Sequence, residues 1–163
     1  MENYLMLNGK RIDLTAEQIE TLVGKKEKGP FERAYFDQDY YYLNDNGRVF
    51  VDRDNLTEAD GERFLAANYC TDKELMEQRA LHETLNRLLW RYSMRNGGEK
   101  THTLRSKWWH IVRYEDGELD AFENSYNDYW TPGVVWFESY DSAANAIEEI
   151  VKPFMEKNPE FRW

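Results

Sequence analysis

One apolar stripe constrains the fold of this chain more than any other feature. Between residues 81 and 92, apolar side chains recur every three to four positions, which is the spacing of one helix face: Leu81, Leu85, Leu88, Leu89 and Tyr92. Asp72 predicts the N-cap of this helix and Gly97 its end. The same spacing returns near the C-terminus, at Ala143, Ile147, Ile150, Val151 and Phe154. The sequence therefore predicts two helices of one kind, both packed on a sheet.

The opposite side of the long helix is also apolar. At about 100° per residue, Met76, Trp90 and Met94 lie opposite the stripe. A helix with apolar residues on two sides needs a second contact. We expect Trp90 and Met94 to be covered by a second subunit or by the N-terminal segment, which has an apolar stripe of its own: Ile19, Leu22 and Val23.

Turn signals divide the β-rich parts of the chain into hairpins. Asn8 and Gly9 predict a tight turn between two strands, and a capping box of Thr15 and Gln18 then begins a short helix. Two further hairpins are predicted, each followed by a third strand: residues 40–43 and 48–51 with 64–70, and residues 108–114 and 119–122 with 134–137. Residues 52–62 are expected to form a polar loop.

These elements predict an α+β fold with two antiparallel three-stranded units, each followed by a helix. A hairpin and helix form an N-terminal appendage (residues 1–29), and the core (residues 30–163) divides into halves at 30–98 and 99–163. The strand-to-helix junctions of the halves align: Tyr69, Cys70 and Asp72 match Trp136, Phe137 and Ser139. An internal duplication and two unrelated junctions of the same kind both explain this match. One continuous sheet and two separate small sheets are both compatible with this pattern.

Composition narrows the class of protein. The 163 residues suit one domain, and 41% hydrophobic with 15% aromatic residues suffice for a sizeable core. A net charge of −10 argues against a general nucleic-acid binder or a membrane-surface protein. A single cysteine, Cys70, excludes an intrachain disulfide and fits a reducing compartment. The chain shows neither an apolar run of membrane-spanning length nor a signal peptide, so we expect a cytoplasmic protein.

Motifs of catalysis and metal binding are missing from the sequence. It has no nucleophile elbow, phosphate loop or dinucleotide fingerprint. The three histidines, His82, His102 and His110, lack zinc-site spacing, and Cys70 lies in an apolar stretch that predicts a buried structural thiol. The acidic run from Asp52 fails the calcium-loop pattern, because Thr57 and Arg63 occupy the required glycine and glutamate positions. We therefore predict no catalytic residue, metal or cofactor.

Charges are segregated along the chain. Residues 37–62 hold eight acids against two arginines, and residues 87–113 hold seven basic residues against one acid. Residues 115–151 contain no Lys or Arg and ten acids: Glu115, Asp116, Glu118, Asp120, Glu123, Asp128, Glu138, Asp141, Glu148 and Glu149. Ordinary solvated surface is the simpler explanation of such segregation, and a surface that meets an oppositely charged partner is the alternative that we carry forward.

Three short segments carry a resemblance to known proteins. Residues 7–12, residues 29–33 and the aromatic residues 40–43 before Gly47 resemble a family of small proteins from bacterial phages and prophages. Those proteins also show an aromatic strand running into a helix rich in Glu and Ala, in two copies. The resemblance implies origin from a mobile element, and hence the host bacterial cytoplasm, but no catalytic residue.

Together these features favour a counter-defence inhibitor that binds a host protein. Bacterial defence nucleases hold nucleic acid in channels lined by Lys and Arg. An acidic, aromatic-rich surface could occupy such a channel, with carboxylates in place of phosphates and aromatic side chains as anchors. The predicted partner-binding residues are Glu115, Asp116, Glu118, Asp120, Glu123, Tyr126, Asp128, Tyr129 and Trp130.

Two other functions remain open on the sequence alone. One is a sponge for an anionic nucleotide signal, in which basic side chains meet phosphates and a tryptophan stacks on the base: Arg105, Lys107, Trp108, Trp109 and Arg113. The other is a structural or assembly protein, in which an exposed edge strand pairs two subunits as a homodimer. Direct binding of nucleic acid and attachment to a membrane are not expected.

Overall fold

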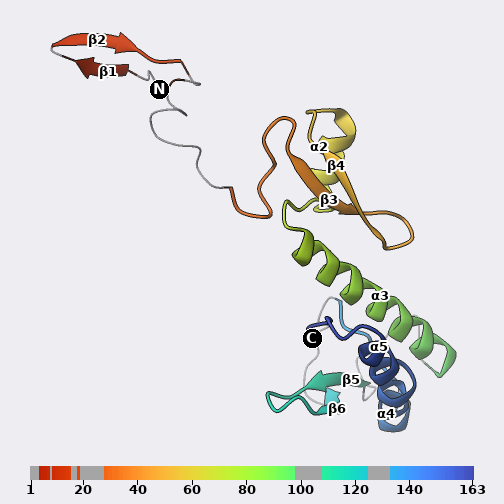
Figure 1. Cartoon of the computed structure of the whole chain (residues 1–163). Coiled ribbons are helices and arrows are strands. Elements are labelled where there is room, and N and C mark those ends of the chain that lie inside the picture. The colour runs from red at the N-terminus through yellow and green to blue at the C-terminus, as the bar shows by residue number, and fades with distance from the viewer. Residues whose placement is uncertain (1–3, 8, 16–17, 19–27, 98–107, 125–132) are drawn as a thin grey trace.

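The computed structural model describes residues 4–7, 9–15, 18, 28–97, 108–124 and 133–163. Its elements follow in this order (Figure 1): β1 (Tyr4–Leu7), β2 (Lys10–Asp13), β3 (Asp39–Leu43), β4 (Val49–Arg53), α2 (Glu58–Leu65), α3 (Lys73–Arg95), β5 (Trp108–Arg113), β6 (Leu119–Asn124), α4 (Tyr140–Ala146), the π-helical turn η1 (Ile147–Val151) and α5 (Lys152–Lys157). Helices combined with small sheets confirm the predicted α+β class. Within these ranges, no helix has the length and apolar character needed to cross a membrane.

Each sheet of the described chain has two antiparallel strands: β1–β2, β3–β4 and β5–β6. The first is the predicted N-terminal hairpin, whereas the other two were predicted to have a third strand. The strand predicted over residues 64–70 is wrong, because α2 runs through Leu65. Thr57 and Asp60 form a capping box that starts α2 inside the expected polar loop. The box was missed because Asp stands where Glu or Gln is usual. Residues 134–137 also form no strand, and Phe137 makes a single bridge to Trp109.

The two halves nevertheless pass from sheet to helix with the same geometry. In each, one residue of the first strand exchanges two backbone hydrogen bonds with a residue two positions before a helix N-cap. The pairs are Tyr41 with Cys70, at 2.7 and 2.9 Å, and Trp109 with Phe137, at 3.0 and 2.8 Å. The caps that follow are Asp72 and Ser139. The junctions aligned from the sequence therefore match in structure, whereas duplication itself stays a prediction.

Helix α3 connects these halves, and its predicted bounds and stripe are confirmed. The Asp72 side chain accepts a hydrogen bond from the Leu75 N–H at 3.1 Å, and Gly97, at φ +92°, follows the C-cap. Leu85 and Leu89 are buried in the main core, which α3 forms with β5, β6 and the C-terminal helices (Figure 1). The start of α3 packs elsewhere: Met76 is buried against the β3–β4 side, in a smaller cluster with Leu43 and Cys70.

The described residues of this chain leave the second apolar side of α3 partly uncovered, and cover by a second subunit stays a prediction. Trp90 is 60% exposed, although Met94 is half-buried. The β1–β2 hairpin of the predicted appendage forms as expected, with Gly9 at φ +76° in its turn. It lies away from α3 (Figure 1), so it cannot shield Trp90. The predicted stripe of residues 19–23 lies outside the described residues.

Hydrogen bonds hold the C-terminal segment against α3. The Gln78 side chain donates to the Glu160 carbonyl at 2.7 Å and accepts from the Arg162 N–H at 2.9 Å. Phe161 is buried, with its ring 5.4 Å from that of Phe154. Upstream, η1 precedes Pro153, which lies in the first turn of α5. Proline lacks the N–H of a regular helical bond, which accounts for the local widening.

Candidate functional site

The first acidic cluster of the sequence is used inside the fold. Arg33 binds Asp54 with two hydrogen bonds, Nε to Oδ2 at 2.8 Å and Nη2 to Oδ1 at 3.1 Å. The Tyr69 hydroxyl and the Leu56 N–H also donate to this carboxylate, at 2.8 and 2.9 Å. Asp54 is 0% exposed, and the hydrogen bond from Arg33 is the main cause that lowers its pKa. These contacts tie the chain before β3 to the segment after β4.

A second buried carboxylate anchors α2 to β3. The Tyr40 hydroxyl donates to Asp60 Oδ1 at 2.8 Å, and it accepts a hydrogen bond from the Arg63 guanidinium. Burial raises the pKa of Tyr40 to about 12. The rings of Tyr40 and Tyr69 stack with centroids 4.1 Å apart, so the two buried carboxylates share one aromatic core.

Three exposed acids of the same cluster, Asp37, Asp39 and Asp52, also have arginine partners. Arg53 lies 3.2 Å from an Asp37 oxygen and 3.3 Å from an Asp39 oxygen, and Arg63 lies 2.8 Å from Asp52. Most acids of residues 37–62 therefore have an arginine partner. This cluster stabilises the fold, and its three acids without an ion-pair partner in the described chain, Asp45, Glu58 and Glu62, are spread over a turn and α2.

The second acidic cluster differs in that three of its exposed members lie together at the β5–β6 turn. Gly117 adopts φ +92° there, and Tyr114 and Glu118 close the turn with a 2.9 Å backbone hydrogen bond. Three predicted partner-binding residues are exposed on it: Glu115, Asp116 and Glu118, which we call the acidic turn. Among the described residues none of the three has a Lys or Arg at ion-pair distance.

Other predicted partner-binding residues are less accessible. Asp120 is half-buried, and its Oδ1 accepts from the Ala121 N–H at 2.7 Å. Glu123 is half-buried opposite Trp109 in the sheet register. Tyr126, Asp128, Tyr129 and Trp130 lie outside the described residues. The hairpin therefore brings together only part of the predicted set.

Sequence reasoning missed two aromatic side chains beside the acidic turn. Tyr114 is 47% exposed and Phe122 is 53% exposed. In the hairpin register Tyr114 lies opposite Glu118, and Phe122 lies two positions further along the same face as Asp120. The period-two alternation of β6 could have identified this face. It supplies aromatic contact area next to free carboxylates.

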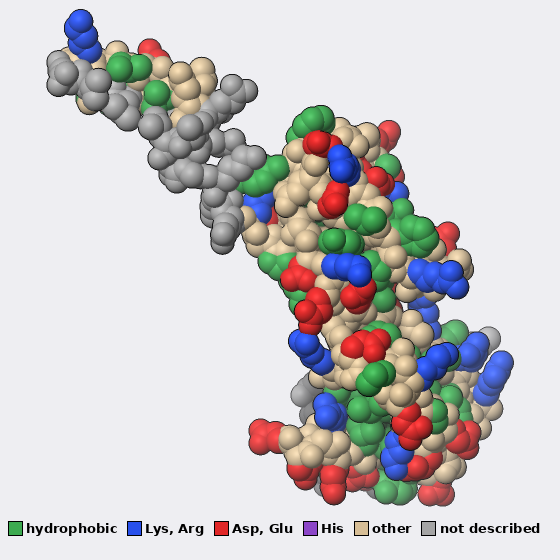
Figure 2. Space-filling model, viewed as in Figure 1, with side chains coloured by type: hydrophobic (Ala, Val, Ile, Leu, Met, Phe, Trp, Pro, Cys, Tyr) green, Lys and Arg blue, Asp and Glu red, His purple; other side chains and the backbone are tan. Residues whose placement is uncertain are grey.

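Acidic side chains also follow the last helices. Figure 2 shows them along the end of the molecule where β6 and α4 lie. Glu148 is paired with Lys152, and Glu149 faces Tyr92, whose pKa is raised mainly by burial. Asp141 is exposed in the first turn of α4. Exposed acids therefore occur on the last helices as well as on the acidic turn.

The alternative basic set is not assembled by the part of the chain that the structure describes. Trp108 is only 5% exposed, and the Trp109 ring meets Tyr140 edge-on at 5.3 Å. Arg113 is at the other end of β5, where its Nη2 would lie 3.5 Å from a Cβ added to Gly117. It therefore stands beside the acidic turn, not beside Trp108. Arg105 and Lys107 lie outside the described residues.

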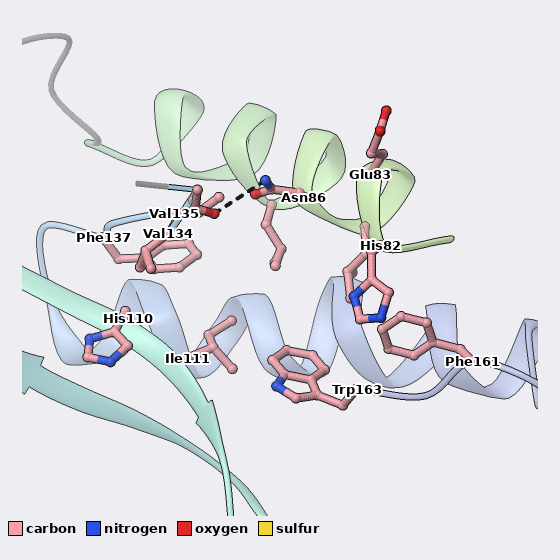
Figure 3. Close-up of a pocket in the computed structure, with 13 residues that line it drawn as sticks. His82, Glu83, Asn86, His110, Ile111, Val134, Val135, Phe137, Phe161 and Trp163 are labelled. Atoms are coloured by element: carbon pink, nitrogen blue, oxygen red, sulfur yellow. Dashed lines mark hydrogen bonds between the residues drawn. The ribbon is translucent and has the colours of Figure 1, made fainter. Parts of the chain in front are cut away.

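A cavity of about 420 Å³ lies between α3, β5 and the C-terminal segment (Figure 3). Its walls are mostly apolar, including Ile111, Val134 and Phe161, with His82 and Asn86 at the α3 side. The Asn86 side chain is engaged, because it donates to the Gly133 carbonyl at 3.3 Å. Within the described ranges no three His, Cys, Asp or Glu side chains are grouped to hold a metal ion. The cavity could take a small apolar molecule.

Comparison of the chain with protein-family models, curated proteins and solved structures finds no match.

Proposed function

We propose that this chain is a non-enzymatic binding protein whose acidic turn docks on a basic surface of a protein partner. The observation that carries the proposal is the contrast between its two acidic clusters. Arginines neutralise most of the first, whereas Glu115, Asp116 and Glu118 project from a hairpin with no cation partner in the described chain. Free carboxylates steer association toward positive surfaces and fix its register.

The neighbouring aromatic side chains support a protein partner over a simple counter-ion. Tyr114 and Phe122 are exposed on the hairpin that carries the acidic turn. Large aromatic side chains contribute most to protein interfaces when they become buried among charged contacts. A hairpin tip is also narrow enough to enter a groove between basic side chains.

The partner we propose is the nucleic-acid channel of a bacterial defence nuclease, which makes the chain a counter-defence inhibitor of the anti-CRISPR kind. Such channels bind phosphates through Lys and Arg. The resemblance of residues 7–12, 29–33 and 40–43 to phage proteins supports this choice. On this proposal the chain acts in the host bacterial cytoplasm and needs no cofactor.

A nuclease-protection assay tests the function. The wild-type chain should protect target DNA from purified defence nucleases, tested as a panel. Reversing the acidic turn (Glu115→Lys, Asp116→Lys, Glu118→Lys) should abolish protection. A matched control changes three exposed acids elsewhere: Asp45→Lys, Glu62→Lys and Glu156→Lys. Protection that survives in the folded turn variant, or the lack of protection by the wild type across the panel, contradicts the proposal.

A further inference from the structure

Helix α3 carries an exposed surface whose charge is opposite to that of the acidic turn. It consists of Arg87, Trp90, Arg91 and Arg95, which we call the basic ridge; all four are exposed. At about 1.5 Å per residue the ridge spans about 12 Å of helix. Figure 2 shows Lys and Arg side chains gathered over this end of α3. The ridge is a local exception on a chain of net charge −10.

The ridge is incompletely satisfied within the described chain. Arg87 is paired with Glu83 of the same helix at 3.1 Å, but Arg91 and Arg95 have no carboxylate at ion-pair distance there. Trp90, three positions after Arg87 and directly before Arg91, exposes 60% of its surface. Tryptophan and arginine are both enriched among the residues that dominate binding energy at interfaces.

The acidic turn has the complementary chemistry. It offers three carboxylates with no described cation partner, beside the exposed rings of Tyr114 and Phe122. Arginine guanidinium groups bind carboxylates with two hydrogen bonds and stack on aromatic rings. The two surfaces do not pair within one chain, because no ion pair links them. Each copy of the chain thus presents both halves of one possible contact.

We infer that the basic ridge is covered by the acidic turn of a second copy of this chain. The contact buries Trp90 against Tyr114 and Phe122 and pairs Arg91 and Arg95 with carboxylates of the turn. It goes beyond the proposed function, although it uses the same acidic turn. A basic partner therefore competes with self-association and releases the chain as monomers.

Charge-swapped variants of the full chain test this contact by sedimentation velocity at low and high salt. The ridge variant carries Arg91→Glu and Arg95→Glu, and the turn variant carries Glu115→Lys, Asp116→Lys and Glu118→Lys. The wild type should associate with rising concentration at low salt and dissociate at high salt. Each variant alone should stay monomeric, because its ridge and its turn then carry charges of the same sign. An equal mixture should associate again, because the ridge of each variant is opposite in charge to the turn of the other. The restored association also shows that both variants are folded.

Net charge alone predicts a different result. The turn variant is less negative than the wild type, so it should associate more strongly if overall repulsion governs self-association. Trp90→Ala keeps every charge and should raise the dissociation constant at least about tenfold. A wild type that stays monomeric at low salt, variants that associate as it does, or a mixture that stays monomeric would each overturn the inference.

The ridge variant separates this inference from the proposed function. It keeps the acidic turn, so it should still protect DNA in the nuclease assay while remaining monomeric. Protection without self-association in the wild type removes only the inference. Self-association without protection across the panel removes only the proposed function.

Discussion

Asp54 is a buried carboxylate that joins distant segments in the first half of the chain. It is buried and accepts hydrogen bonds from Arg33, Tyr69 and Leu56. Asp54→Ala leaves buried donors without an acceptor, so it should destabilise the fold by roughly 3 kcal/mol. Urea unfolding at pH 7 measures this. The control Asp45→Ala, at an exposed turn position, should change stability by less than about 0.5 kcal/mol. Equal effects of the two changes would contradict the structural role of Asp54.

The stabilisation by Asp54 should depend on pH in a defined direction. The hydrogen bond from Arg33 lowers the pKa of Asp54 in the folded chain, whereas an unfolded Asp titrates near about 3.9. The folded state therefore holds fewer protons, and the stabilisation is present above the unfolded pKa and lost as the pH falls through the folded pKa. The stability gap between wild type and Asp54→Asn should be largest above about pH 5 and narrow on acidification. A gap that does not change with pH would rule this out.

Local residue chemistry could be predicted from the sequence, and distant pairing could not. The Asp72 cap and the β1–β2 hairpin depend on neighbours within a few positions, so their patterns suffice. The burial of Asp54 depends on Arg33, 21 residues away, which no local pattern reveals. The acidic run was therefore predicted as a solvated loop, although much of its charge is engaged inside the fold.

At the scale of elements, α3 should respond differently on its two sides. Leu85 is buried in the main core, so Leu85→Ala should destabilise by roughly 2–5 kcal/mol. Trp90 is exposed on the other side, so Trp90→Ala should change the stability of the monomer by less than about 0.5 kcal/mol. Thermal and urea unfolding of dilute protein measure both. A large loss of monomer stability in Trp90→Ala would show that the chain itself covers this side chain.

The C-terminal segment should depend on Gln78. Its side chain makes two hydrogen bonds to the backbone of this segment, at Glu160 and Arg162. Gln78→Ala should speed amide hydrogen exchange in residues 158–163 while leaving exchange in α3 unchanged, since α3 keeps its own helical bonds. Glu77→Ala, on the exposed side of the same turn, is the control. Unchanged exchange at the C-terminus would show that other contacts, such as buried Phe161 and the Arg162–Glu74 ion pair, hold the segment without Gln78.

Helices could be predicted where the hydrophobic period extends over several turns, and the prediction failed where the helix is short. The stripe of α3 repeats over several turns, so its type and buried face followed from spacing. Helix α2, at eight residues, is too short for a clear period and was divided between a loop and a strand. The third strands were overpredicted because the residues around Cys70 and Phe137 are apolar, as in a buried strand. In the structure each of these two residues forms one isolated bridge, and no strand extends from it.

At the scale of the molecule, the two acidic clusters of the sequence differ in how many of their acids form ion pairs. The acids of residues 37–62 are mostly paired with arginines, whereas the acidic turn is not. The sequence predicted Glu115, Asp116 and Glu118 as partner-binding residues, and the structure places them together on an exposed turn. The sequence could not indicate which of the two acidic clusters has carboxylates without a cation partner, because ion pairing depends on residues that are distant in the chain.

The most direct test of this account is the affinity for a fluorescent peptide rich in Lys and Arg, measured by anisotropy at low salt. The turn variant (Glu115→Lys, Asp116→Lys and Glu118→Lys) should bind the peptide at least about tenfold more weakly than the wild type. The control variant with Lys at residues 45, 62 and 156 has the same net charge, and its affinity should stay within about twofold of wild type. Equal weakening of both variants would show that binding follows net charge and that the acidic turn is not a site.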